Sequence, residues 1–344
     1  MHVHLHRRDR AGRTLMRLRH PSGRIVHLSC EIAARPVSNL PALVAELDNY
    51  GAVRARLGAD RLGVDLWLPP TLAAALAVES RARTRLRAEL DARRLEVVTL
   101  SGAPFAEGGG EPPTDAAAQP DSGAQLDAGA RSGAGVEPSW TEPARREYTL
   151  DLARILLDLL DADAVRGAVS TIGLGPRPGW AEAADKASLG ILRRLSAGLA
   201  DLAWQNGRAV RVGFQPAPGL VLDTPEQTVA AMSRMDRERL GVCLDLGHVA
   251  RSWPDPAGGI EALTDAGLSV IEVRLAAVPG GTTEPWRTAL RQVFGAAGPL
   301  TEYLTLQSRG PGQTPEQIAA DVAYLLAELA ALGLAPEVET CPVR

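Results

Sequence analysis

One alternation covers most of the chain and limits the folds that it can adopt: short apolar runs separated by helical patterns. The apolar runs lie at residues 25–30, 62–68, 95–100, 168–174, 210–214, 240–244, 269–275 and 303–306. The helical patterns lie at residues 38–57, 71–94, 142–160, 181–206, 225–235, 260–266, 284–294 and 315–332. Eight strand–helix units predict a single (β/α)8 TIM barrel, an α/β fold of roughly 250 residues that tolerates insertions. A doubly wound open sheet is the alternative.

Three segments fall outside this alternation. Residues 1–23 carry several histidines and arginines and predict a poorly ordered N-terminal extension. Residues 106–139 are almost entirely Gly, Ala, Pro, Asp, Ser, Glu and Gln, which predicts a flexible low-complexity insertion after the third strand. We therefore expect the barrel over residues 24–334 and a C-terminal tail over residues 335–344.

Composition excludes several classes of function. The 344 residues include 37 basic and 41 acidic ones, and this balance argues against a nucleic-acid partner. Lys186 is the one lysine, which removes most Schiff-base chemistry. The three cysteines, Cys30, Cys243 and Cys341, are odd in number and widely spaced, as is typical of a reducing compartment. No segment resembles a signal peptide or a membrane span, so we expect a cytoplasmic location.

Polar side chains end several of the predicted strands. In a parallel barrel, inward-facing residues at the carboxyl ends of the strands line the pocket. The residues in such positions, together with a histidine three residues beyond one of them, are Trp67, Ser101, Gln215, Asp245, His248, Arg274 and Gln307. We expect them to surround one mouth that binds a small molecule, although Trp67 serves equally well as a packing residue.

Charged residues also occur deeper in the strands. A buried charge costs several kcal/mol unless it is paired, so we expect mutual neutralisation inside the barrel among Asp65, Asp245, Glu272, Arg211 and Arg274. The Asp245-x-x-His248 spacing suits a ligand pair, an acid–base pair or a loop anchor. In an acid–base pair, Asp245 would orient His248 and raise the pKa of its imidazole, and Arg274 would hold a substrate oxyanion or carboxylate.

The order and spacing of six segments resemble a known family. These segments are residues 27–29, 62–68, 96–100, 170–175, 212–219 and 241–248. Together they resemble the EboE-type metabolite-traffic proteins, divergent members of the xylose-isomerase-like (sugar phosphate isomerase/epimerase) TIM-barrel superfamily. The resemblance implies a role in metabolite traffic or specialised metabolism. It also implies a divalent metal at the barrel mouth, held from strands five to eight, with two glutamates that bind the metal and move the proton.

The chain departs from this family pattern where the metal would bind. The expected Phe-Glu-Pro-Glu-Pro-Gly reads Phe-Gln-Pro-Ala-Pro-Gly at residues 214–219, which puts Gln215 in place of a glutamate. The last strand likewise carries Gln307 in place of the second glutamate. One unit charge at contact is worth roughly 4 kcal/mol at an effective dielectric of about 20, and Arg274 opposes a cation further. We therefore expect no tightly bound divalent metal, and a weak one at Asp245 and His248 stays open.

Three functions fit this pattern. The first is a metal-independent isomerase, epimerase or lyase acting on a small polyol-like or carbonyl metabolite. Here Asp245 and His248 are catalytic, and the substrate-binding residues are Trp67, Ser101, Gln215, Arg274 and Gln307. The second is a non-catalytic ligand-binding or scaffold protein, a pseudoenzyme, which the loss of both glutamates favours. The third, less favoured, is an intact divalent-metal sugar isomerase.

Overall fold

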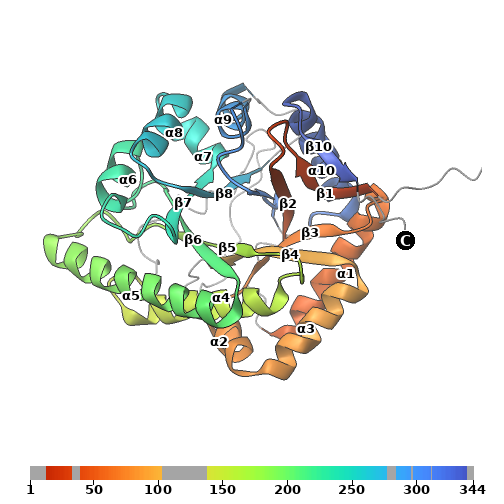
Figure 1. Ribbon diagram of the computed structural model, residues 1–344, viewed down its shortest axis with the longest axis horizontal. Helices are drawn as coiled ribbons and strands as arrows, with labels where there is room; N and C mark the ends of the chain where they lie inside the picture. The colour runs from red at the N-terminus through yellow and green to blue at the C-terminus, as the bar shows by residue number, and fades with distance from the viewer. Residues whose placement is uncertain are drawn as a thin grey trace, which may run out of the picture.

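Eight parallel strands close into a barrel in the computed structural model, which describes residues 13–32, 39–102, 138–276, 284–295, 297–310 and 312–338 (Figure 1). The barrel strands are β2 (Ile25–Ile32), β3 (Leu62–Trp67), β4 (Leu95–Gly102), β5 (Arg166–Ile172), β6 (Ala209–Gln215), β7 (Leu240–Asp245), β8 (Val270–Leu275) and β9 (Tyr303–Leu306). Each strand pairs with the next, and β2 pairs with β9 to close the ring. The predicted TIM barrel is confirmed, and the open sheet is excluded.

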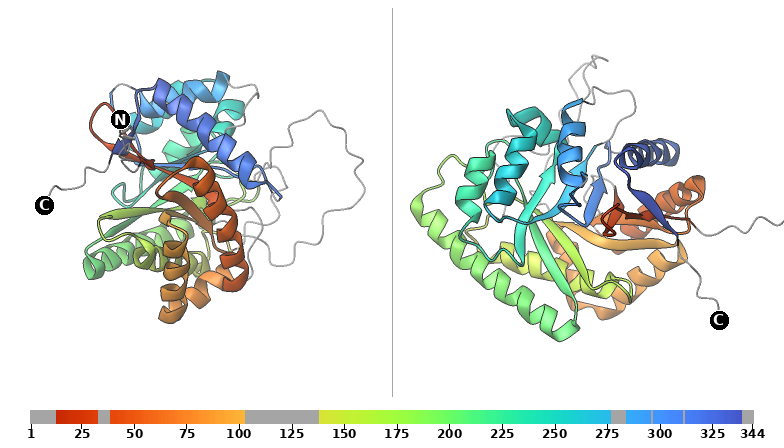
Figure 2. Two further views of the ribbon diagram at one scale, coloured as in Figure 1. Left: turned by 90° about the vertical axis from the view of Figure 1, so that its right-hand side faces the viewer. Right: turned by 45° about the horizontal axis from the view of Figure 1, so that its top comes forward.

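Ten helices in the described segments surround these strands (Figures 1 and 2). They are α1 (Leu40–Leu57), α2 (Pro70–Val78), α3 (Ser80–Ala92), α4 (Pro143–Leu159), α5 (Glu182–Asn206), α6 (Pro225–Met232), α7 (Leu246–Ser252), α8 (Pro256–Asp265), α9 (Glu284–Phe294) and α10 (Pro315–Ala331). The helix predicted over residues 71–94 is two helices, because Glu79 has an extended backbone. None of the helices in the described segments has both the length and the apolar character that a membrane span needs.

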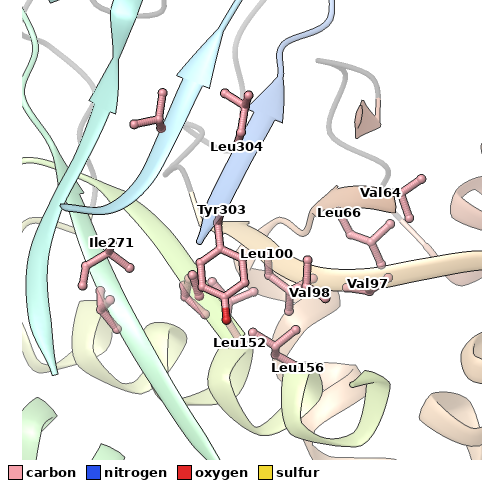
Figure 3. Packing of buried hydrophobic residues seen from close by; sticks show 14 of the residues in the cluster. Val64, Leu66, Val97, Val98, Leu100, Leu152, Leu156, Ile271, Tyr303 and Leu304 are labelled. Carbon is pink, nitrogen blue, oxygen red and sulfur yellow. The ribbon is translucent and has the colours of Figure 1, made fainter. Parts of the chain in front are cut away.

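The hydrophobic core fills the layer between the strands and the surrounding helices (Figure 3). Leu152 and Leu156 of α4 are fully buried against strand residues such as Leu100. Fully burying one such side chain stabilises the fold by roughly 1.5–3 kcal/mol. The packing is close at Gly102, where an added Cβ would collide with Leu152. The core therefore fixes α4 against β4 and β5, whose carboxyl ends reach the mouth.

The N-terminal region contains a strand that we did not predict. Residues Arg13–Arg19 form β1, which pairs antiparallel with β2 and with β10 (Ala335–Val338). Met16 and Leu18 are buried and alternate with arginines, the period of a half-buried strand. A poorly ordered extension over residues 1–23 is therefore wrong for residues 13–23, and residues 335–338 are not a loose tail. Residues 1–12, 103–137 and 339–344, which include most of the predicted insertion, lie outside the described residues.

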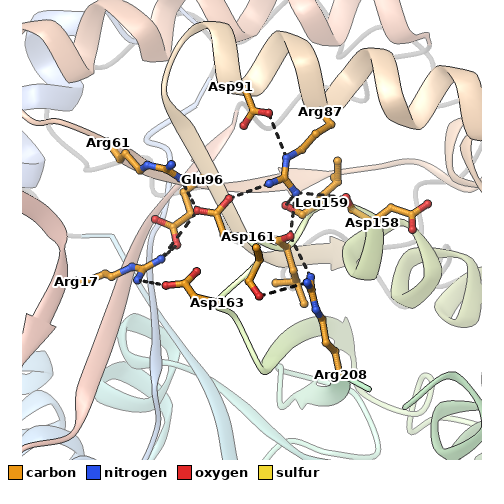
Figure 4. Close-up of polar contacts among 12 residues, drawn as sticks. Arg17, Arg61, Arg87, Asp91, Glu96, Asp158, Leu159, Asp161, Asp163 and Arg208 are labelled. Atoms are coloured by element: carbon orange, nitrogen blue, oxygen red, sulfur yellow. Dashed lines mark hydrogen bonds and ion pairs between the residues drawn. The ribbon is translucent and has the colours of Figure 1, made fainter. Parts of the chain in front are cut away.

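An ion-pair network at the amino end of the barrel connects β1 to β4 and to the residues before β5 (Figure 4). Arg17 donates to Glu96 of β4 at 2.7 Å and to Asp163, before β5, at 2.8 Å. Arg61 and Arg87 both pair with Asp161. Because Glu96 is buried, its charge depends on Arg17 for a partner.

We predict that Arg17→Met destabilises the protein by about 3 kcal/mol, the low end of the range for breaking a buried ion pair, since Arg17 retains some exposure. Arg19→Met is the matched control, because Arg19 pairs with Glu337 in a more exposed position and should cost less than about 1 kcal/mol. Urea unfolding measures both variants. Equal, small effects would contradict a stabilising role for β1.

Candidate functional site

The carboxyl ends of the strands carry polar side chains that are only half-buried. Trp67, Gln215, Asp245 and Gln307 end or directly follow β3, β6, β7 and β9. The Gln307 amide donates a hydrogen bond to Oδ2 of Asp245 at 3.1 Å and thereby bridges the end of β8. These four residues define the mouth of the barrel, and Asp245 and Gln307 are in direct contact there.

Directly inside the mouth, Arg274 of β8 is the centre of a buried ion cluster. Its guanidinium donates to Glu31 at 2.8 Å and to Asp65 and Glu272 at 3.3 Å each. It also donates to the hydroxyls of Ser101 and Ser170. Arg274 is only 4% exposed. The guanidinium is therefore hydrogen-bonded to protein side chains. This argues against the prediction that Arg274 binds a substrate oxyanion directly.

The predicted mutual neutralisation of buried charges holds for part of the set. Asp65, Glu272 and Arg274 form the cluster, as expected. Arg211 does not join it, because its side chain donates to the backbone carbonyls of Glu238 and Arg237. Asp245 also stays apart, bound to Gln307 and to the start of α7.

Two members of the cluster were missed by sequence reasoning. Glu31 is the next-to-last residue of β2, and its second carboxylate oxygen accepts the backbone N–H of Ser308. Ser170 of β5 pairs in register with Ser101 of β4 and shares a hydrogen bond with it. The sequence does contain a signal for Glu31, because the alternation Ser29-x-Glu31 places two polar residues on one face of β2. Ser101, predicted to contact the ligand, is instead buried within the cluster.

Burial governs the protonation of these acids. Burial raises the pKa of Glu272 to about 8, against the opposing effect of Arg274, and it also raises the pKa of Glu31. Burial therefore disfavours the ionised form of Glu272, and the Arg274 guanidinium favours it. Glu31, Asp65 and Glu272 together therefore carry a smaller total negative charge than three ionised carboxylates would.

We predict that the free energy of unfolding falls as the pH rises from about 4.5, the ordinary pKa of the glutamate side chain, to about 8, and that Glu272→Gln flattens this fall. A carboxyl whose pKa is raised in the folded state stabilises most at low pH and loses that contribution as pH rises through the folded value. Glutamine resembles the neutral acid and does not titrate. Urea unfolding at several pH values tests this, and parallel slopes for wild type and variant would contradict it.

His248 does not have the protonation that its sequence context predicts. Asp245 caps α7 by accepting the backbone N–H of His248 at 3.0 Å, while the imidazole Nδ1 lies 3.1 Å from the Ser252 hydroxyl. Nε2 lies 3.9 Å from Asp223. Burial lowers the pKa of His248 and outweighs the carboxylates Asp245 and Asp223, which raise it. The expected rise was therefore wrong, because desolvation exceeds the attraction; the ring is neutral at pH 7.

The mouth is a poor match for the divalent metal that the family resemblance implies. Its one carboxylate, Asp245, already accepts hydrogen bonds on both oxygens, from His248 and Gln307. Gln215 and Gln307 add neutral amide groups, and the Arg274 cation lies next to Asp245 in register. Divalent cations such as Mg²⁺ favour several anionic oxygen ligands. Within the described residues, no group of three or more His, Cys, Asp or Glu side chains is arranged to hold a metal ion.

Comparison with solved structures finds proteins with the same barrel fold. No protein-family model matches the chain, and no curated protein matches its sequence. The 3-keto-D-glucoside 4-epimerase of E. coli superposes with a TM-score of 0.52 at 12% identity, over 88% of this chain and 99% of that one. D-psicose 3-epimerase of Clostridium cellulolyticum gives 0.52 at 15% identity, over 89% and 98%.

A third similar structure is a xylose isomerase domain protein from Planctomyces limnophilus, with a TM-score of 0.51 at 14% identity over 81% of this chain and 90% of that one. At such identities the likeness concerns the fold. The EboE-type assignment stays a prediction. The chain shares the (β/α)8 barrel fold of these two epimerases and of the xylose isomerase domain protein.

Proposed function

We propose that the mouth of the barrel binds a small polyol-like or carbonyl metabolite and isomerises or epimerises it without a tightly bound divalent metal. The observation that carries this proposal is the Asp245–Gln307 pair at the mouth, beside the half-buried Gln215 and Trp67. Carboxylate and amide groups bind hydroxyl groups, and an aromatic ring packs on apolar faces, a combination typical of small-molecule sites. The epimerase and isomerase neighbours support the same class of ligand.

The chemistry needs a base. Isomerisation removes a proton from the carbon next to a carbonyl and returns a proton to a neighbouring carbon or to the other face. A neutral imidazole can accept the first proton, and the lowered pKa of His248 keeps its ring in that form at pH 7. Asp245 fixes the position of His248 through its backbone and thus acts as a positioning residue. This enzyme would serve metabolite traffic or specialised metabolism in the cytoplasm.

The second candidate is a non-catalytic ligand-binding protein. One observation favours it: Nε2 of His248 is buried and has no hydrogen-bond partner among the described residues. A base so enclosed would need a side-chain rearrangement to reach a substrate. Binding at the mouth, by contrast, needs only the half-buried groups.

We predict proton exchange with solvent. The EDTA-treated protein, incubated in D2O with a panel of ketoses, aldoses and cyclic polyols, should incorporate deuterium next to the carbonyl of its substrate, as read by NMR. His248→Ala should slow this exchange by about 10²- to 10⁴-fold, the usual contribution of a general base. His20→Ala is the matched control, because His20 is also buried but contacts Ser22 and Gly295, away from the mouth.

The same panel separates the two candidates. A compound that perturbs mouth resonances but shows no exchange in the wild type supports the binding protein. Exchange that survives His248→Ala would remove His248 from the mechanism. No binding of any compound, together with intact folding, would contradict the proposed ligand class.

We predict that protein purified without chelator carries substoichiometric divalent metal and that Gln215→Glu with Gln307→Glu creates measurable Mn²⁺ affinity. The two added carboxylates restore two negative charges to the mouth. Elemental analysis and thermal melts with added Mn²⁺ measure these effects. Gln205→Glu, on the exposed side of α5, is the control and should bind no Mn²⁺. Full metal occupancy of the wild type would overturn the metal-independent proposal.

A further inference from the structure

The barrel interior directly beneath the Arg274 cluster is lined by small side chains. The members of the cluster point into the barrel, so the residues two positions earlier on their strands face inward as well. Register adds Cys243, which pairs with Glu272, and Thr305, which pairs with Ser29. The small inward-facing residues at this level, all buried, are Ser29, Thr99, Ala168, Cys243 and Thr305. They take up less of the interior than the bulky branched side chains that ordinarily fill such a barrel.

Five oxygen atoms in this part of the interior have no hydrogen-bond partner among the described residues. They are Oγ of Ser29, Oδ1 of Asp65, Oγ1 of Thr99, Oε2 of Glu272 and Oγ1 of Thr305. Each of these residues is at most 1% exposed. An unpaired buried polar atom costs at least as much as a good hydrogen bond contributes, so five of them would offset much of the stability of an ordinary domain. In folded proteins such atoms find partners, and water is the partner where protein atoms do not reach.

The five atoms come from neighbouring positions on the barrel wall. Thr99 pairs in register with Asp65, and Ser29 pairs with Thr305. Thr305 lowers the pKa of Glu272, so the two groups lie close together, yet both atoms stay outside hydrogen-bond geometry. Hydroxyls and carboxylates thus approach one another without direct hydrogen bonds. A water molecule accepts from a hydroxyl and donates to a carboxylate, and it needs two to four such partners.

We propose that the interior beneath Arg274 binds a small cluster of ordered water molecules. The residues that hold this water cluster are Ser29, Asp65, Thr99, Glu272 and Thr305. The water cluster gives the two carboxylates hydrogen-bond donors in addition to the guanidinium. Because a hydroxyl donates or accepts as needed, the site suits either protonation state of Glu272. The proposal does not depend on the identity of the ligand at the mouth.

Oxygen-17 relaxation dispersion of the solvent tests the proposal, because it counts the water molecules that stay buried in a protein. The variant that combines Ser29→Ala, Thr99→Val and Thr305→Val removes three hydroxyls from the site. It should hold about two fewer buried water molecules than the wild type, since one water bonds to at most about four of the five atoms. Thr149→Val is the matched control and should keep the wild-type number. The Thr149 hydroxyl is also buried, but it donates to the Arg145 carbonyl within α4.

The direction of a stability change gives a second readout for the single variants Thr99→Val and Thr305→Val. Valine has the shape of threonine without its hydroxyl. Loss of a hydroxyl that is bonded to water should lower the Tm by about 2 °C or more, whereas loss of an unpaired hydroxyl should raise it. A rise in Tm for both variants, or equal water counts in the wild type and the triple variant, would overturn the proposal.

A high-resolution crystal structure of the wild type provides a test that needs no variant. Electron density for water between Thr99 and Asp65, and beside Ser29 and Thr305, would support the proposal. Direct hydrogen bonds between these side chains, or an interior without water density there, would rule it out.

Discussion

The contact between Arg274 and three buried carboxylates is the interaction on which the interior of this barrel depends. It joins β2, β3 and β8 through ion pairs and reaches β4 and β5 through Ser101 and Ser170. Without the guanidinium, three acids would face one another in a water-poor space, at a cost of several kcal/mol. The buried cluster beneath the mouth therefore contains both the acids and the positive group that balances them.

The amino end of the barrel uses the same chemistry. Arg17 pairs with the buried Glu96, and Arg87 donates to Asp161 and to backbone carbonyls at the C-terminal end of α4. A guanidinium offers five donors in a planar group and can satisfy several acceptors at once, which an ammonium does less well. This accounts for the value of arginine at these positions in a chain with a single lysine.

The fold was largely predictable because strands and helices follow local periodicity. All eight barrel strands lie at the predicted positions. We missed β1 because its arginines resemble a basic terminal extension. One of its two partner strands, β10, also lies at the other end of the chain. The site was less predictable. Two properties of His248 depend on three-dimensional packing. One is whether Asp245 binds its ring or its backbone, and the other is whether burial or nearby charge controls the pKa of the ring. Glu31 joins Arg274 across 243 residues, a contact that no local pattern encodes.

In our proposal the half-buried residues at the mouth bind the ligand, and the buried cluster around Arg274 balances charge beneath them. The most direct test is a crystal structure of the protein purified without chelator and soaked in MnCl2, with anomalous diffraction recorded for manganese. Our account predicts the Arg274 guanidinium among Glu31, Asp65 and Glu272, with no manganese peak at the mouth. A manganese ion bound by Gln215, Asp245 and Gln307, or Arg274 turned away from the three acids, would contradict it.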